Sequence, residues 1–219
     1  RYISTGDRVA YVANTSGAYS EQRLVPGDRV VRLPEGISDQ VAAAVLLKGL
    51  TAQMLVRQLY RVRRNDYVLV HAAAGGVGSL VVSWAKHIGA RVLALVGSES
   101  KVEHVKQLGA DQVLLTDADW VAAARQFSAK AGMHVVYDSV GKDTFMRSLD
   151  CLRPRRMMVT YANSSGPVPP VVGPFRADLG AGRAAGRGGG AGRAGPLPAD
   201  HADGVVELVG DRIPHRDER

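Results

Sequence analysis

The stretch YVLVHAAAGGVG, residues 67–78, decides the fold of this chain. Its first four residues are a short apolar run of the kind that forms a buried strand. Small residues follow and lead into a helical pattern over 76–88, so the backbone can approach an anion while the helix N-terminus offers free N–H groups. Ala73 stands where the usual glycine fingerprint has its first glycine. In this strand–turn–helix context, the stretch predicts a turn that binds the pyrophosphate of a dinucleotide.

Alternation of strand and helix patterns continues on the C-terminal side of this turn. Apolar runs at 91–96, 112–115, 134–138 and 157–160 predict four more strands, and the segments 76–88, 98–108, 117–130 and 143–152 between them read as helices. This rhythm predicts an α/β fold with a doubly wound parallel sheet of the Rossmann type. Before it, residues 3–12 and 17–31 suggest short antiparallel strands, and two helices are expected between Ser38 and Leu59.

The composition excludes several classes of protein. With 46% hydrophobic residues, the chain of 219 residues can bury a core and is not a disordered polymer. Its single cysteine, Cys151, excludes an intrachain disulfide and a four-cysteine zinc site, which fits a reducing, cytoplasmic setting. No apolar run approaches the roughly 20 residues of a membrane-spanning helix. The chain starts at Arg1 within a strand-like pattern, which suggests a fragment.

The last part of the chain has a different composition. Gly, Ala, Arg and Pro fill 23 of the 28 positions from 173 to 200, and no apolar periodicity is present. We therefore expect residues 173–219 to form a low-complexity, disordered or irregular tail. A shifted reading frame in GC-rich coding sequence is one hypothesis for its origin. Seven arginines balance seven acidic residues there, so the net charge of +7 belongs to residues 1–172 and the tail is not a basic arm.

Cofactor choice depends on the end of the second strand of the series. An NAD-specific site usually has an acidic residue there, whereas this chain has Gly97 and Ser98. Ser98 can donate to a 2′-phosphate and Lys101 can add a positive charge, so NADPH is favoured over NADH. If Glu99 points at the ribose, the preference becomes mixed, and Lys101 as an ordinary solvated residue remains an alternative.

Other candidate groups have ordinary structural interpretations. His71 lies at the end of a buried strand, where a structural role is more frequent than acid–base catalysis. Basic residues at 57, 61, 63 and 64 are typical of a solvated helix end, although they leave nucleic-acid binding open as an alternative. No Gly-x-Ser-x-Gly elbow and no metal-binding spacing is present, so hydrolase and zinc-site chemistry have no support.

Several separated motifs resemble one known family in their order along residues 1–172. They are LKGLT at 47–51, HAAAGGVG at 71–78, WAK at 84–86, VYDSVG at 136–141, RSLDCL at 147–152 and NSSG at 163–166. The chain is thus similar to the NADPH-dependent quinone oxidoreductase, or zeta-crystallin-like, branch of the medium-chain dehydrogenase/reductase superfamily. The resemblance implies hydride transfer from NADPH to a quinone or related conjugated carbonyl.

The resemblance also implies a domain organisation. Residues 1–37 would be a remnant of a β-rich, GroES-like catalytic domain, 38–172 the Rossmann domain and 173–219 the tail. Zinc alcohol dehydrogenases of the superfamily carry a cysteine-rich lobe that is absent here, and a zinc-binding Cys near the position of Lys48, so the resemblance implies a zinc-free enzyme. Intact family members imply a homodimer.

Site residues carried over from the resemblance cluster around one cofactor. The resemblance places Thr51 near the nicotinamide, Gly75, Gly76 and Val77 on the pyrophosphate, and Gly97, Ser98 and Lys101 by the adenosine phosphate. It places Ser139 and Val140 beside the ribose–nicotinamide part, and Tyr161 and Ser164 under the ring. Thr116 stands where many relatives have a Tyr beside the adenosine. No catalytic side chain is assigned. Two alternatives remain open, a catalytically impaired NADPH-binding fragment and a protein that binds single-stranded RNA, the latter not favoured.

Overall fold

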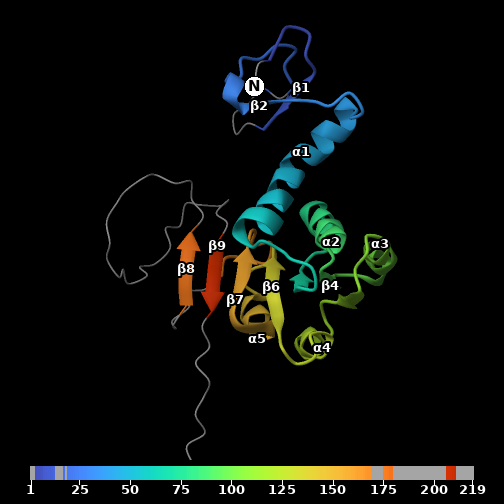
Figure 1. The fold of residues 1–219 in the computed structure, drawn as a ribbon, viewed down its shortest axis with the longest axis vertical. Coiled ribbons are helices and arrows are strands. Elements are labelled where there is room, and N and C mark those ends of the chain that lie inside the picture. The colour runs from blue at the N-terminus through green and yellow to red at the C-terminus, as the bar shows by residue number, and fades with distance from the viewer. Residues whose placement is uncertain (1–2, 13–16, 18, 169–174, 180–205, 211–219) are drawn as a thin grey trace, which may run out of the picture.

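The computed structural model describes residues 3–12, 17, 19–168, 175–179 and 206–210. Its N-terminal part is a small antiparallel pair, β1 (Val9–Tyr11) and β2 (Val30–Arg32), with a 3-10 turn, η1 (Gly27–Arg29), before β2. A long helix, α1 (Asp39–Gln53), leads from this pair to the main sheet (Figure 1). Short antiparallel strands were predicted for this region, and the described pair agrees with that prediction.

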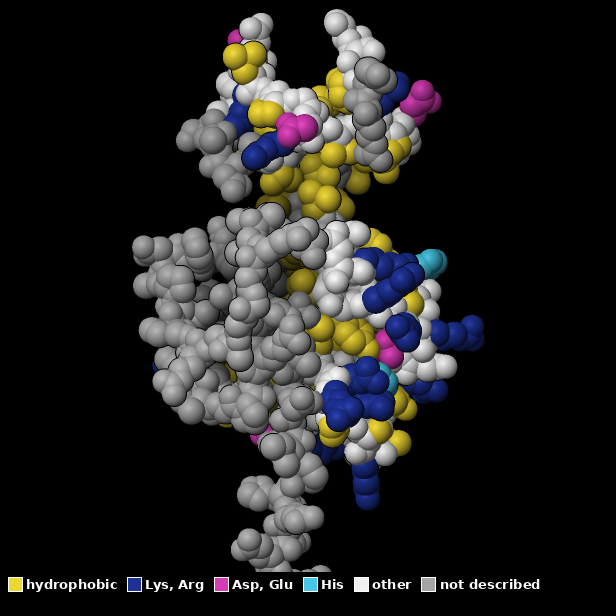
Figure 2. Space-filling view, turned by 60° about the vertical axis from the view of Figure 1, so that its left-hand side comes forward, with side chains coloured by type: hydrophobic (Ala, Val, Ile, Leu, Met, Phe, Trp, Pro, Cys, Tyr) yellow, Lys and Arg dark blue, Asp and Glu magenta, His cyan; other side chains and the backbone are white. Residues whose placement is uncertain are grey.

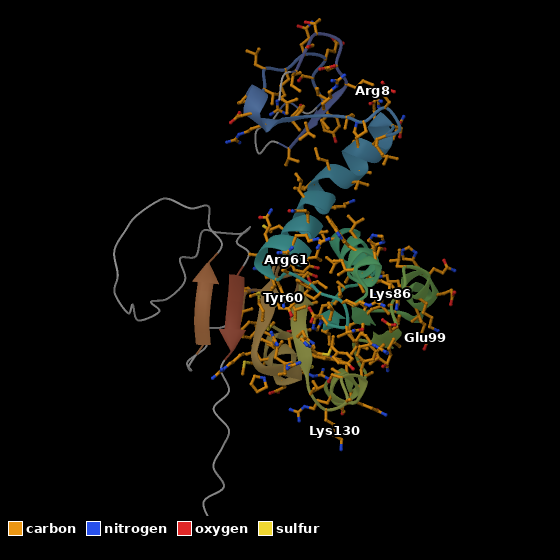
Figure 3. All side chains as sticks on the ribbon, viewed as in Figure 1. Arg8, Tyr60, Arg61, Lys86, Glu99 and Lys130 are labelled. Atoms are coloured by element: carbon orange, nitrogen blue, oxygen red, sulfur yellow. The ribbon has the colours of Figure 1, made fainter. Side chains whose placement is uncertain are left out.

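The start of α1 is held by a cap and an ion pair. Ser38 Oγ accepts a hydrogen bond from the backbone N–H of Val41 at 3.3 Å, as expected for a helix N-cap. Arg8, labelled in Figure 3, donates to Asp39 Oδ1 at 2.6 Å and to the carbonyl of Ile37 at 2.7 Å. These contacts connect the edge of the two-stranded unit with the first turn of α1.

Two helices were expected up to Leu59, but α1 continues without a break into a π-helical segment, η2 (Met54–Leu59). The wider π turn leaves the carbonyl of Leu55 able to accept from both Tyr60 N at 3.2 Å and the buried Tyr137 hydroxyl at 3.0 Å. Tyr137 lies on a strand 82 residues away, so this contact is long-range. Tyr60, at the base of the helix in Figure 3, donates its hydroxyl to Asp66 at 3.1 Å.

The main sheet has the predicted strands in a parallel arrangement, in the order β5-β4-β3-β6-β7. In chain order these strands are β3 (Tyr67–Val70), β4 (Arg91–Val96), β5 (Gln112–Leu115), β6 (Met133–Asp138) and β7 (Leu152–Thr160). The segments between them contain α2 (Gly76–Ile88), η3 (Glu99–Lys101), α3 (Val102–Gln107), α4 (Trp120–Phe127) and α5 (Phe145–Cys151). The α/β class and the parallel sheet are confirmed.

Both faces of the sheet are covered, because alternate side chains of each strand point to opposite sides. On one face Val68 and Val70 pack in a cluster with side chains of α1, α2 and α3. On the other face Leu69 packs with Trp120 of α4 and Cys151 of α5. All of these strand residues are fully buried. The doubly wound arrangement therefore follows from the apolar residues on both faces of each strand.

The C-terminal end of the sheet differs from the expectation of an irregular tail. Two strands, β8 (Phe175–Leu179) and β9 (Val206–Gly210), extend the sheet, with β9 antiparallel to β7 and β8 antiparallel to β9. Strand β7 also starts at Leu152, earlier than the predicted 157, despite the Pro and charged residues of 153–156. The remaining residues of 173–219 lie outside the described part of the chain, and the domain boundaries at 37/38 and 172/173 stay predictions.

Among the residues that the structure describes, none of the helices is both long enough and apolar enough to cross a bilayer.

Candidate dinucleotide-binding site

The order of the strands defines a topological switch point between β3 and β6. From β3 the chain proceeds outward through β4 and β5, whereas β6 and β7 lie on the other side of β3. In open α/β sheets ligands bind in the crevice at the carboxyl ends of the strands, where the order reverses. The segments after β3, β4, β6 and β7 all leave this edge, and they contain every predicted site residue except Thr51.

The turn after β3 has the geometry that its small residues predicted. Ala72 has a φ of +47°, its carbonyl accepts from Gly75 N at 2.8 Å, and Gly75 is the N-cap of α2. A Cβ on Gly78 would overlap the carbonyl oxygen of Ala72 and lie 3.0 Å from Ala73 Cα, so a glycine is needed for α2 to pack this close to the strand end. Gly75 and Gly76 are exposed.

The first turn of α2 therefore forms a cradle for an anion. The amides of Gly76, Val77 and Gly78 have no preceding turn of helix to accept from them, because the first four N–H groups of any helix lack intrahelical partners. Together with the positive end of the helix dipole, such amides favour phosphate oxygens. This observation supports the fit of a pyrophosphate to the residues that the sequence singled out.

Lys48 of α1 also reaches this cradle. A Cβ built on Gly76 would lie 2.7 Å from Lys48 Cδ and 2.8 Å from Cε, so the lysine side chain lies directly against the start of α2. A cation near a helix N-terminus is unfavourable by itself, and an anion bound between the two would relieve that repulsion. From the sequence, Lys48 was expected only to stand at the position of a zinc ligand, and this contact with Gly76 was not predicted.

Thr51 lies one turn further along α1, partly buried, and its hydroxyl donates to the carbonyl of Leu47 at 3.0 Å. The helix thus brings Lys48 and Thr51 to successive turns of one helix, but the hydroxyl of Thr51 is engaged by its own backbone.

The residues after β4 form an exposed turn. Ser98 Oγ lies 3.0 Å from Ser100 Oγ, and Lys101 is the last residue of η3. A Cβ on Gly97 would meet nothing within 4 Å, so the space beside this backbone is open. Glu99 is also exposed and lies near α3 in Figure 3. A ligand could therefore reach Ser98 and Lys101, which favour a 2′-phosphate, as well as Glu99, which would favour a ribose hydroxyl.

The segments after β6 and β7 form a cross-linked platform. Ser164 N and Ser164 Oγ both donate to the carbonyl of Ser139 at 3.2 Å, and Ser165 N donates to the carbonyl of Val140 at 2.8 Å. Tyr161 N donates to the carbonyl of Asp138 at 3.0 Å. Burial raises the pKa of the Tyr161 hydroxyl, with a hydrogen bond to Ser139 acting in the opposite direction. The structure thus brings four predicted residues, Ser139, Val140, Tyr161 and Ser164, together.

Beneath this platform lies a buried polar network that sequence reasoning did not assign to the site. Asp138, fully buried at the end of β6, accepts hydrogen bonds from the side chains of Thr144 and Ser148 at 2.7 and 3.0 Å. Ser148 also contacts His71 Nε2 at 2.8 Å. The available signal was an acidic residue ending an otherwise apolar strand. His71 itself is fully buried, as its position on the strand suggested.

Comparison with known proteins identifies the family. The profile of the family described as zinc-binding dehydrogenase matches residues 76–186, which is half of the chain. This chain belongs to that family. The match extends past residue 172, where the resemblance was expected to end.

Within this family, the chain belongs to the quinone oxidoreductase branch of the medium-chain dehydrogenase/reductase superfamily, as its relatives show. It is 45% identical over 168 residues to a quinone oxidoreductase of Salmonella typhimurium, covering 76% of this chain and 51% of the relative. It is 42% identical over 172 residues to a 2-haloacrylate reductase of Burkholderia, covering 77% and 52%. The chain spans about half the length of these curated relatives.

A solved structure with the same fold contains a cofactor. Escherichia coli quinone oxidoreductase complexed with NADPH aligns with a TM-score of 0.74 at 42% identity, covering 78% of this chain and 53% of that one.

The family description refers to zinc, but the described part of the chain contains no group of side chains that could bind it. No three His, Cys, Asp or Glu side chains gather there in a way that could hold a metal ion. The residues described do not fit a zinc site, and a zinc-free enzyme stays a prediction.

Proposed function

We propose that this chain is the cofactor-binding part of an oxidoreductase that transfers hydride from NADPH to a quinone or a related conjugated carbonyl. One observation carries the proposal: the anion cradle of α2 and the platform after β6 and β7 both lie at the switch point of the sheet. Ligand sites of open α/β sheets lie at such a point. Relatives named as quinone oxidoreductases, one of them solved with NADPH, support the choice of cofactor and reaction.

Each loop has a proposed part in holding the cofactor. The amides of Gly76 and Val77, with Gly75, would bind the pyrophosphate, and Lys48 would add a charge to the same group. Gly97, Ser98 and Lys101 would lie at the adenosine phosphate. Thr51 and the platform residues Ser139, Val140, Tyr161 and Ser164 would lie beside the nicotinamide half.

The chemistry of the reaction belongs mainly to the cofactor, because NADPH supplies the hydride when it is bound. The protein would contribute orientation and exclusion of water, since hydride transfer needs reacting atoms held about 3–3.5 Å apart. The hydrogen bonds between the segments after β6 and β7 give the platform a fixed shape on which a flat ring can rest. No side chain is assigned a proton-transfer role.

Direct binding tests the proposal. Titration with NADPH should quench the fluorescence of the two tryptophans and enhance the emission of the cofactor. Oxidation of NADPH in the presence of a panel of quinones and enones should then identify the acceptor class. A folded sample that binds no NADPH would contradict the proposal, and binding without turnover would support the alternative of a catalytically impaired fragment.

A nucleic-acid role receives no support from the relatives compared, which are named as reductases. The proposed partner is therefore a small quinone or enone molecule, and homodimerisation is proposed by analogy with intact family members. A cytoplasmic location fits the free, buried thiol of Cys151.

A further inference from the structure

Asp138 organises the turn that follows β6. One carboxylate oxygen, Oδ1, accepts from the backbone N–H of Val140 at 2.7 Å and of Gly141 at 3.1 Å. The other, Oδ2, accepts from the hydroxyls of Thr144 at 2.7 Å and Ser148 at 3.0 Å. The side chain is fully buried, so these four hydrogen bonds take the place of water around the charge.

The turn held by Asp138 is tightly constrained on its other side. Gly141 has a φ of +90°, and a Cβ there would lie 2.7 Å from the carbonyl oxygen of Gly166. The carbonyls of Ser139 and Val140 accept from the segment after β7, as described above. The carboxylate of Asp138 therefore holds the amides of the turn, and the segment after β7 holds the carbonyls of the same turn. As a result, the backbone at 139–141 has little freedom to change shape.

His71 extends the network to the loop after β3. Because the Ser148 hydroxyl donates to Asp138, His71 Nε2 must donate to Ser148 Oγ, which defines the Nε2–H tautomer. Burial lowers the pKa of His71, with the Asp138 carboxylate opposing this and Arg147 adding to it, so the ring is neutral near pH 7. Its backbone N–H donates to the carbonyl of Tyr137 at 2.9 Å. The network thus joins the two loops that border the switch point.

We propose that Asp138 is a positioning residue, whose carboxylate holds the backbone of residues 139–141 in the shape that binds the nicotinamide half of the cofactor, and that Ser148 and His71 orient this carboxylate. The inference rests on the proposed NADPH site. Asp138 does not touch the cofactor in this scheme. It acts through the amides of Val140 and Gly141.

The negative charge of Asp138 determines the direction of every hydrogen bond in the network. In Asp138→Asn, the amide oxygen can keep the turn amides only if its NH₂ group faces Thr144 and Ser148. Both hydroxyls must then reverse, and Ser148 must donate to His71 Nε2. The proton of His71 would move to Nδ1, a buried atom without a hydrogen-bond partner among the described residues. Isotope-edited nitrogen spectra of the His71 ring report this change of tautomer directly.

Binding of whole and half cofactors distinguishes positioning from general destabilisation. For Asp138→Asn we expect NADPH to bind about tenfold or more weakly, the loss typical of a charge-assisted hydrogen bond. Adenosine 2′,5′-bisphosphate represents only the adenosine half, whose proposed contacts are the residues after β4 and the amides at the start of α2. Because none of these contacts is made by residues 139–141, its affinity for the Asp138→Asn chain should stay within about twofold of its affinity for the original chain. Exposed Asp143, in the same segment, provides the matched control Asp143→Asn, which should change neither affinity.

Ser148→Ala serves as a second variant because it leaves both turn amides with their acceptor. It should weaken NADPH by a smaller factor than Asp138→Asn, again without changing binding of the bisphosphate. Equal weakening of both ligands, or unchanged NADPH affinity in a folded Asp138→Asn chain, would overturn the positioning role. If Asp138→Asn does not fold, an equal effect of Ser148→Ala on both ligands would overturn it instead. Failure of the original chain to bind either ligand would contradict the proposed function, a result distinct from any of these.

Discussion

Lys101 has an exposed side chain at the end of η3, one turn beyond the open space beside Gly97. If it contacts the 2′-phosphate, Lys101→Ala should weaken NADPH by about ten- to a hundredfold, corresponding to about 1.5–3 kcal/mol for a charge-assisted contact. NADH, which lacks this phosphate, should be affected little. Fluorescence titration with both cofactors measures the difference. Lys106→Ala, another exposed lysine nearby, is the control, and an equal loss for both cofactors would mean that Lys101 does not contact the phosphate.

The sequence indicates candidate site residues most clearly where the backbone itself would form the site. Gly75, Gly76 and Val77 were proposed because small residues between a strand and a helix have few other uses, and the structure places them at the turn before α2 and in its first turn. Lys48 and Asp138 were missed for a different reason. Lys48 reaches Gly76 across a gap of 28 residues in the sequence, and Asp138 contacts Ser148 and His71 from different elements. Single-sequence periodicity contains no information about such pairs of side chains.

Two glycines that lie within helices, Gly78 and Gly49, provide a matched pair of positions for substitution by alanine. Gly78 is buried against the strand end, and a Cβ there would overlap the carbonyl of Ala72. A Cβ on Gly49, inside α1, would meet Val45 Cγ1 at an ordinary 3.5 Å. Gly78→Ala should therefore destabilise the fold by about 1–3 kcal/mol through overpacking, whereas Gly49→Ala should stabilise it by about 0.5–1 kcal/mol through helix propensity.

Denaturant unfolding of both variants measures these opposite signs. Gly78→Ala should also weaken NADPH, because the overlap displaces the cradle at the start of α2. A Gly78→Ala chain as stable as the original would show that α2 can move away from the strand end without cost.

The strands of the parallel sheet were predictable because they are buried on both faces and are bounded by turns. The helical pattern of α1 was equally clear, but periodicity does not specify what covers a face. Only Ala42 and Ala52 of that helix are buried, while Leu47 and Leu50 are 60% and 51% exposed. The π-helical continuation was not predicted either; there the carbonyl of Leu55 accepts from the hydroxyl of Tyr137, a contact between distant residues that periodicity does not reveal. Neither the covering of a helix face nor a contact of this range can be read from local periodicity.

The whole molecule combines a well-packed sheet unit with a helix that is largely open to solvent. Hydrophobic side chains are visible along α1 between the two-stranded unit and the sheet, and Lys and Arg side chains are numerous on the described surface of the sheet unit (Figure 2). Most of the buried apolar residues belong to the two clusters on either face of the sheet. We infer that global stability depends mainly on the sheet unit, where the buried titratable groups also lie.

Two histidines of that unit make its stability depend on pH. Burial is the largest cause that lowers the pKa of both His71 and His134 below 6.5, while Asp138 and Asp66, respectively, oppose the shift. Below about pH 6.5 the unfolded chain therefore binds protons that the folded chain does not, and stability should fall as the pH decreases toward the folded-state pKa values. Each proton that binds to the unfolded chain but not to the folded one changes the free energy of unfolding by up to about 1.4 kcal/mol per pH unit.

Melting temperatures between pH 7.5 and 5.5 should accordingly decrease with falling pH, most steeply below about pH 6.5. His134→Gln removes one of the two protonation sites, so it should flatten the dependence. A melting temperature that stays constant over this range would mean that folding does not lower the pKa of these two histidines, and one that rises as the pH falls would mean that folding raises it.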